Sequence, residues 1–200
     1  MAIVLDGTNG INTPDLESAG PVSGTTGTFS GAVRASGVAT DIYPLVSATA
    51  VTASGTSVDF TGIPSWVKRI TVMFSGVSTN GTSPPQIQIG SGSVSNTGYA
   101  CSNSVIANAS AITVLFTNGF GIGVNTGNWS SASTVSGVFV IDLVGSNIWC
   151  CSGSVGTTNA AATFFTNGSI TLGGSLDRVR ITTVNGTDTF DAGTINIMYE

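Results

Sequence analysis

Glycine and proline interrupt this sequence so often that no long stretch of it suits a helix. No window keeps apolar residues at the i, i+3, i+4 and i+7 positions of an amphipathic helix. The chain instead carries short runs rich in β-branched and aromatic residues, which are typical of strands. The runs are "VKRITVMFSGV" (67–77), "QIQIG" (86–90), "AITVLFT" (111–117), "VSGVFVIDLVG" (135–145), "NIWCC" (147–151), "SITLGG" (169–174), "RVRITTV" (178–184) and "TINIMY" (194–199). The sequence therefore predicts an all-β fold with about eight strands.

Asn-Gly dipeptides lie close to several of these runs, at 9–10, 80–81, 118–119, 167–168 and 185–186. This dipeptide favours the positive-φ turns that join neighbouring antiparallel strands. Since no helical stretch separates the runs, the pattern favours an antiparallel sandwich or barrel. We predict an antiparallel, jelly-roll-like β-sandwich.

Alternation of apolar and polar residues assigns faces to two of the expected strands. In the run at 67–77, Ile70, Val72 and Phe74 share one face of the strand. In the run at 178–184, Val179 and Ile181 oppose Arg178 and Arg180. We therefore expect the apolar sets in the core, and the two arginines toward solvent or a neighbouring subunit.

The run "VFVIDLV" lacks this alternation, as a strand buried on both faces would, yet it contains Asp142. A buried carboxylate needs hydrogen bonds or an opposite charge. We expect Asp142 to pair with Arg178 or Arg180.

A domain boundary is predicted near residue 56, where the composition changes. Eight of the nine phenylalanines and all three tryptophans follow it. Residues 1–56 have too little apolar area to offset the entropy of ordering the chain, whereas residues 57–200 can build a core. The predicted organisation is an N-terminal attachment and shaft-like segment, 1–56, followed by a C-terminal β-sandwich module, 57–200. Trp66 and Trp149 are expected in the core of that module.

Within the N-terminal segment, single apolar residues recur at intervals of four to seven among Gly, Ser, Thr, Asn and Pro. These residues are Leu5, Ile11, Leu16, Val22, Phe29 and Val33. Disordered tracts are usually rich in charge and poor in β-branched residues, which this segment is not. The spacing instead suits three chains wound together, each contributing one apolar side chain per layer. The segment therefore predicts a trimeric shaft.

Three stretches resemble the tail-fibre-like proteins of tailed bacteriophages. "IVLDGTNGINTPDL" and the following "GTTGTFSGAV" are similar to their amino-terminal and shaft-like parts. "DFTGIPSWVKRITVMFSGVSTNGTS" (59–83) and "LDRVRITTVNGTDTFDAGTINIMYE" (176–200) resemble the terminal module of phage and prophage tail-fibre-like proteins. The resemblance implies a homotrimer on the virion exterior that contacts a host surface glycan or protein, and an N-terminal segment that docks on another virion protein.

Charge argues against some other functions. Charged residues make up only 8% of the chain, and its five basic residues form no cluster that could neutralise a run of phosphates, so no nucleic-acid partner is expected. The apolar run at the amino terminus is too short for a signal peptide or a membrane span, so we expect neither secretion by that route nor membrane insertion.

Catalytic and metal-binding residues are also scarce. The chain has no histidine and no C-x-x-C pair, so we expect no metal site, no cofactor and no Ser-His-Asp or Cys-His nucleophile. Cys101, Cys150 and Cys151 are expected to be free, buried or half-buried thiols. Asp188 and Asp191 in "NGTDTFDAG" are interpreted as turn residues, and not as the carboxylate pair of a glycosidase. We therefore predict a protein that is not an enzyme.

Aromatic residues in polar loops are the candidate binding residues. Trp129 with Asn128 in "NTGNWSSAS", and Tyr99 in "SNTGYACSN", combine a ring that can stack on a sugar with polar neighbours that can bond its hydroxyls. The alternative is that these rings cap the edge of the core or contact a sister chain.

The hypothesis that unites these features is a structural bacteriophage virion protein, a trimeric tail fibre or appendage. Its binding strength would come from three identical heads acting together. Two other hypotheses remain: a head-decoration or head-fibre protein of the capsid, and, more remotely, an extracellular polysaccharide-active enzyme.

Overall fold

The computed structural model describes the backbone of residues 33–34 and 41–42, and residues 43–107, 110–124, 129–158 and 160–200 in full. The chain divides into two compact units, Met1–Ile42 and Tyr43–Glu200. In the first unit, β1 (Val33–Arg34) pairs antiparallel with β2 (Asp41–Ile42). The apolar residues of the expected shaft from Leu5 to Phe29, and the Asn-Gly pair at 9–10, lie outside the described residues.

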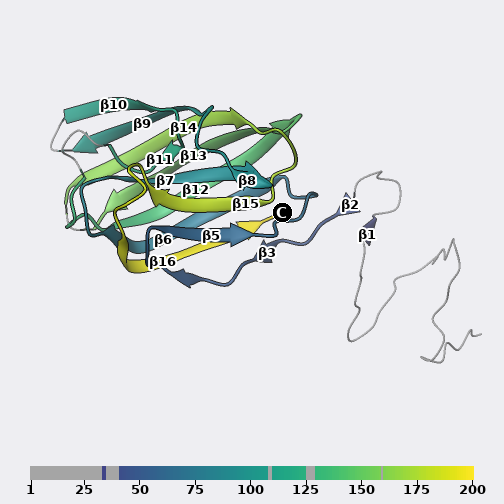
Figure 1. Cartoon of the computed structure of the whole chain (residues 1–200), viewed down its shortest axis with the longest axis horizontal. Helices are drawn as coiled ribbons and strands as arrows, with labels where there is room; N and C mark the ends of the chain where they lie inside the picture. The colour runs from purple at the N-terminus through teal and green to yellow at the C-terminus, as the bar shows by residue number, and fades with distance from the viewer. Residues whose placement is uncertain (1–32, 35–40, 108–109, 125–128, 159) are drawn as a thin grey trace, which may run out of the picture. The chain divides into compact units, whose positions relative to one another are not determined.

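The second unit is all-β, with two antiparallel sheets and no helix among its described residues (Figure 1). The larger sheet has the order β10-β9-β14-β13-β12-β6-β16-β3, and β4 also pairs with β16. Its strands are β3 (Val46–Ser47), β4 (Val51–Thr52), β6 (Arg69–Thr79), β9 (Ala100–Ala107), β10 (Ser110–Phe116), β12 (Val135–Gly145), β13 (Ile148–Thr157), β14 (Ala162–Thr171) and β16 (Phe190–Tyr199).

The smaller sheet has the order β11-β7-β15-β5, and β8 pairs with β7. Its strands are β5 (Ser57–Thr61), β7 (Pro85–Ser91), β8 (Ser93–Val94), β11 (Phe120–Gly121) and β15 (Arg178–Thr183). The chain passes between the two sheets several times, and it goes from the smaller sheet to the larger one between β5 and β6, β8 and β9, β11 and β12, and β15 and β16.

One hydrophobic core fills the space between the sheets and confirms the assigned faces. Ile70, Val72 and Phe74 of β6, and Val179 and Ile181 of β15, are all buried. Alternation predicts them correctly because successive side chains of a strand point to opposite faces.

All eight expected runs form strands or parts of strands, but one of the expected turns is wrong. Asn167 and Gly168 lie inside β14, where Asn167 is in register with Ser102 on one side and Ser152 on the other. A Cβ at Gly168 would lie 2.7 Å from the Cα of Cys101. This glycine therefore serves close strand packing and not a turn. Gly186, in the β15–β16 turn, has the expected positive φ of 69°.

Residues 43–56 belong to the second unit, so it starts before the boundary near residue 56 that composition suggests. β3 and β4 add to the edge of the larger sheet along β16, and Ala53 is buried. Tyr43 stacks on Trp66 with ring centroids 4.7 Å apart. Few aromatics are needed here, because the segment gains its stability from backbone pairing and one ring stack.

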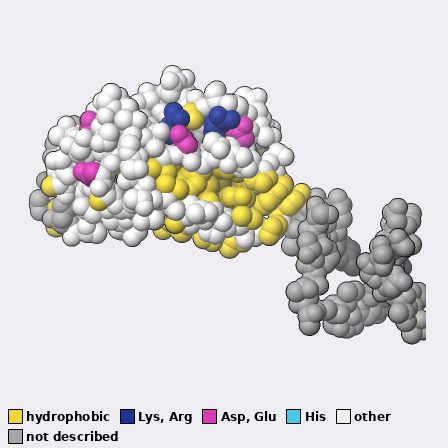
Figure 2. Space-filling view, turned by 60° about the horizontal axis from the view of Figure 1, so that its bottom comes forward, with side chains coloured by type: hydrophobic (Ala, Val, Ile, Leu, Met, Phe, Trp, Pro, Cys, Tyr) yellow, Lys and Arg dark blue, Asp and Glu magenta, His cyan; other side chains and the backbone are white. Residues whose placement is uncertain are grey.

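Trp66, which was expected in the core, is only half-buried and packs against the edge of the core. Trp149 is buried as expected. Around β3 and β4 the exposed large hydrophobic residues are Tyr43, Leu45 and Val51. Figure 2 shows a band of hydrophobic side chains along this side of the molecule.

Asp142 does not have the predicted partners, and its strand is not buried on both faces. Phe139 and Ile141 of β12 are fully buried, while Val138 and Val144 are exposed. Asp142 lies on the exposed face, where Arg69 of the adjacent β6 is in register with it. The Arg69 Nε donates to Asp142 Oδ1 at 2.7 Å, and both side chains are about half-exposed (52% and 46%). A strand neighbour thus supplies the countercharge.

The three cysteines are free. Cys101 and Cys151 are buried, and burial raises the pKa of both thiols. Cys150 is exposed, where a buried or half-buried thiol was expected. The opposite faces of β13 account for this difference between neighbours.

The two sides of β12 should respond very differently to substitution. We expect Ile141→Ala to lower the free energy of unfolding by about 2 to 5 kcal/mol, because it leaves a cavity in the core. Asp142→Ala should lower it much less, since a half-exposed ion pair contributes little. Urea unfolding of both variants is the measurement. A loss for Asp142→Ala equal to that for Ile141→Ala would show that the ion pair is not the surface pair described.

Candidate functional site

Trp129 is a core residue and not an open sugar-stacking platform. Its side chain is 3% exposed. The indole Nε1–H donates to the hydroxyl of Thr79 at 3.1 Å, and the ring packs against Phe164. Asn128, its expected companion, lies outside the described residues. The interpretation of Trp129 as a saccharide contact is therefore wrong for this structure, because no face of the ring is open to solvent.

Tyr99 is also buried, at 3% exposure, so the same interpretation is wrong for it. Its hydroxyl accepts a hydrogen bond from the amide of Ile89 at 2.8 Å and lies 3.1 Å from the carbonyl of Ser95, to which it can donate. Its ring meets Phe120 edge-on. Burial raises the pKa of this hydroxyl. The alternative, that these rings close the edge of the core, describes both residues.

The outer face of the smaller sheet is polar. Thr182 of β15 is in register with Ser57 of β5 on one side and Gln86 of β7 on the other. One step along the strands, Arg180 lies in the same way between Asp59 and Gln88. These residues alternate with the core positions of the same strands, so their side chains point away from the core.

Loops enclose part of this face and form a recess of about 390 Å³. Its floor is made by Gln86, Gln88, Arg180 and Thr182, and its walls include Asn96, Asn118 and Asn185. Gln86 is only 2% exposed and Gln88 only 7%, although both point outward. Outward side chains of an open sheet are normally exposed. The low exposure of these two glutamines therefore shows that the surrounding loops cover them.

Hydrogen bonds to the backbone and to neighbouring side chains fix several groups in the recess. Gln88 Nε2 donates to the carbonyl of Asn118 at 2.7 Å, and the Thr182 hydroxyl donates to the carbonyl of Thr56 at 2.9 Å. Gln86 Oε1 is buried and has no hydrogen-bond partner among the described residues. The recess therefore contains several polar groups that are fixed in place, while the Gln86 oxygen is buried close to Gly119.

Arg180 brings no uncompensated charge to the recess. Its Nε and Nη2 donate to the two carboxylate oxygens of Asp59 at 2.7 and 3.0 Å. These hydrogen bonds raise the pKa of Arg180. On the same face, Arg178 is paired with Asp177. The expectation that Arg178 or Arg180 pairs with Asp142 is therefore wrong. Arg180 has Asp59 on the neighbouring strand as its partner, and Arg178 has the adjacent Asp177.

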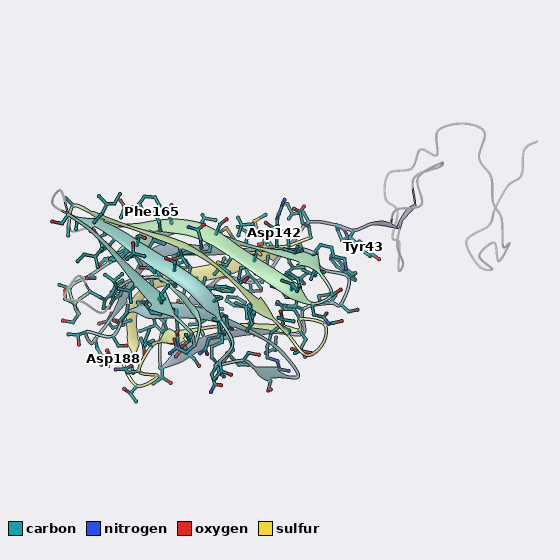
Figure 3. All side chains as sticks on the ribbon, turned by 90° about the horizontal axis from the view of Figure 1, so that it is seen from above. Tyr43, Asp142, Phe165 and Asp188 are labelled. Carbon is teal, nitrogen blue, oxygen red and sulfur yellow. The ribbon has the colours of Figure 1, made fainter. Side chains whose placement is uncertain are left out.

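One rim of the recess is the β15–β16 turn, which Asp188 organises (Figure 3). Asp188 Oδ1 accepts from Asn185 Nδ2 at 2.7 Å, and Oδ2 accepts from the amide of Ser83 at 2.9 Å. These donors lower the pKa of the carboxyl. The hydroxyl of Ser78 donates to Asp191 in a separate contact. The interpretation as a turn residue fits Asp188, but it is wrong for Asp191, which lies in β16 and is bonded to Ser78 of the neighbouring β6.

The chemistry offered by the recess is hydrogen bonding by amides and hydroxyls. No described residue of its lining carries a carboxylate, an imidazole or a thiol. Among the described residues, no three His, Cys, Asp or Glu side chains gather as a metal site would require. A second hollow of about 420 Å³, beside Leu115 and Asn167, is mainly apolar.

One pattern in the sequence indicates part of the recess. The alternation in "QIQIG" places Gln86 and Gln88 on one face opposite two isoleucines, which marks an outer face built of amides. The wall residues had no such signal, because Asn96, Asn118 and Asn185 come from three separate loops that only the fold brings together.

Comparison with protein-family models, curated proteins and solved structures finds no match to this chain. The described residues contain no helix that is long and apolar enough to span a membrane.

The structural role of Tyr99 can be tested directly. Tyr99→Phe should lower the free energy of unfolding by about 1 to 3 kcal/mol, because it leaves the buried amide of Ile89 without its partner. Tyr199→Phe, at a half-buried tyrosine, is the control and should cost clearly less. Chemical unfolding of both variants measures this, and an unchanged stability for Tyr99→Phe would contradict the buried hydrogen bonds described.

The Asp188 turn should make stability depend on acid pH. Because the folded pKa of Asp188 lies below the ordinary 3.8, its stabilising effect is present above that value and is lost as the pH falls through the folded pKa. The stability advantage of the wild type over Asp188→Asn should therefore shrink between about pH 5 and pH 2. Thermal unfolding across this range measures the difference, and a constant gap would exclude Asp188 as its source.

Proposed function

We propose that this chain is a structural protein of a tailed-bacteriophage virion, a trimeric tail fibre or appendage that contacts the host cell surface. In this proposal the unit Tyr43–Glu200 is a jelly-roll-like β-sandwich head. The N-terminal segment is a trimeric shaft that docks on another virion protein. The protein acts by attachment and not by catalysis.

The observation that carries the proposal is the place of the two stretches that resemble the terminal module of tail-fibre-like proteins. Residues 59–83 supply most of β5 and all of β6, while residues 176–200 supply β15 and β16. β5 pairs with β15 in the smaller sheet, and β6 pairs with β16 in the larger one. Stretches far apart in the sequence thus form one continuous unit through both sheets, as parts of one module would.

The surface of the head supports attachment through hydrogen bonds. The outer face of the smaller sheet carries Ser57, Gln86, Gln88 and Thr182, and its arginines are paired with carboxylates. Such a surface attracts few partners by charge alone. The recess is a polar hollow on this face, and its described lining offers no pair of carboxylates for glycoside hydrolysis.

The proposal predicts a particle-bound trimer. Light scattering of the purified full-length chain should give the mass of three chains, and gold-labelled antibody should mark the tails of intact virions. Labelled protein should also adsorb to host cells, whereas cells of an unrelated species serve as the control. Label on the capsid would favour the head-fibre alternative, and sustained release of reducing ends from host polysaccharide would favour the enzyme. A monomer that labels no particle and binds no host cell would overturn the proposal.

A further inference from the structure

We propose that the recess on the smaller sheet is a binding site for an uncharged saccharide. The inference rests on the proposed function, since it names the chemistry of the host-surface contact. It assigns that contact to Gln86, Gln88 and Thr182 on the floor and to Asn96, Asn118 and Asn185 on the walls. These residues are distinct from Trp129 and Tyr99, which are buried in the core.

Amides and hydroxyls match the hydrogen-bonding pattern of sugars. A sugar hydroxyl both donates and accepts, and a side-chain amide offers two donors and an acceptor in one planar group. The recess gathers five such amides from strands β7 and three separate loops. A ligand with several adjacent hydroxyls can therefore bond to more than one wall at once, whereas a purely apolar ligand would leave these groups unpaired.

The floor is partly fixed before a ligand arrives. Gln88 is held by the carbonyl of Asn118, and Thr182 is held by the carbonyl of Thr56. Groups held in this way lose little freedom on binding. Gln86 Oε1 is buried close to Gly119, so it adds no acceptor for a ligand.

The charge of the recess favours an uncharged ligand. Arg180 is the only charged residue among the described residues of the lining, and Asp59 already occupies its guanidinium with two hydrogen bonds. Recognition of a carboxylate or phosphate normally uses an arginine fork that is free to form such a bidentate pair. An acidic sugar would therefore have to displace Asp59, while a neutral one would not.

The recess lacks an aromatic platform, so each site should bind weakly. Among the described residues its lining contains no Trp, Tyr or Phe, and Val94 and Val184 are its only large apolar residues. Weak sites on three linked heads can still give strong attachment, because the later contacts form at high effective concentration. Immobilised, closely spaced glycans are therefore the suitable probe.

The test uses the full-length protein, fluorescently labelled, on an array of neutral hexose and N-acetylhexosamine oligosaccharides with their uronic-acid and sialic-acid counterparts. Asn96→Trp places a large side chain at an exposed wall position of the recess. Asn167→Trp makes the same change at an exposed position on the outer face of the larger sheet. Circular dichroism and unfolding curves of both variants establish that they remain folded.

We expect binding to at least one neutral oligosaccharide, reduced about tenfold or more by Asn96→Trp. The control Asn167→Trp should stay within about twofold of the wild type, as surface substitutions usually do. Binding of acidic glycans alone, binding unaffected by Asn96→Trp, or no binding to any neutral member would overturn the inference. Adsorption to host cells by a protein that binds no neutral glycan would leave the proposed function standing and this inference refuted. Glycan binding through the recess without adsorption to cells would support this inference and refute the proposed function.

Discussion

Pairing between two distant segments holds this fold together. The segment from β5 to β6 and the segment from β15 to β16 each cross from the smaller sheet to the larger one, and they pair with each other in both. The β15–β16 turn is also bonded to the loop between β6 and β7: the amide of Ser83 donates to Asp188, the amide of Asn185 donates to the hydroxyl of Ser83, and the amide of Thr189 donates to Asn80. The side chains that these strands turn inward are buried on both sheets. Every other strand of the two sheets adds to one side or the other of this four-strand unit.

The polar recess is a consequence of that unit. Because β15 must turn Val179 and Ile181 inward to meet the core, it must turn Arg180 and Thr182 outward. The bonded loops place the Asn185 turn at the rim, and β7 adds Gln86 beside Thr182 and Gln88 beside Arg180. The same residues that fix how the sheets pack thus determine where amides and hydroxyls gather. A binding surface supported in this way is held by rigid strands and not by a loop alone.

The sequence predicted the strands whose apolar residues alternate with a period of two. It missed the features that depend on contacts with residues far away in the sequence. The alternating strands were predictable because their cores follow a period of two residues. β9, "ACSNSVIA", was missed because a buried asparagine interrupts its pattern; Asn103 Nδ2 is satisfied by the carbonyl of Gly121 and the hydroxyl of Thr166, neither of which is near in sequence. Trp129 was misassigned for the same reason. Its neighbours in sequence are polar, but Thr79 and Phe164 bury it. For Asp142, only the register of β12 on β6 identifies Arg69 as the partner.

The paired arginines give this surface its chemical character. Arg69 bonds to Asp142 and Glu200, Arg178 to Asp177, and Arg180 to Asp59, so each of these cations is neutralised where it stands. A charge-poor surface of this kind produces a weak electrostatic field and gives little long-range attraction to a charged partner. Selectivity must then come from the fit of hydrogen bonds at short range, where an unpaired buried amide or hydroxyl is costly. For such a surface, a hollow that fixes several amides at once is a more selective feature than any single exposed ring or charge.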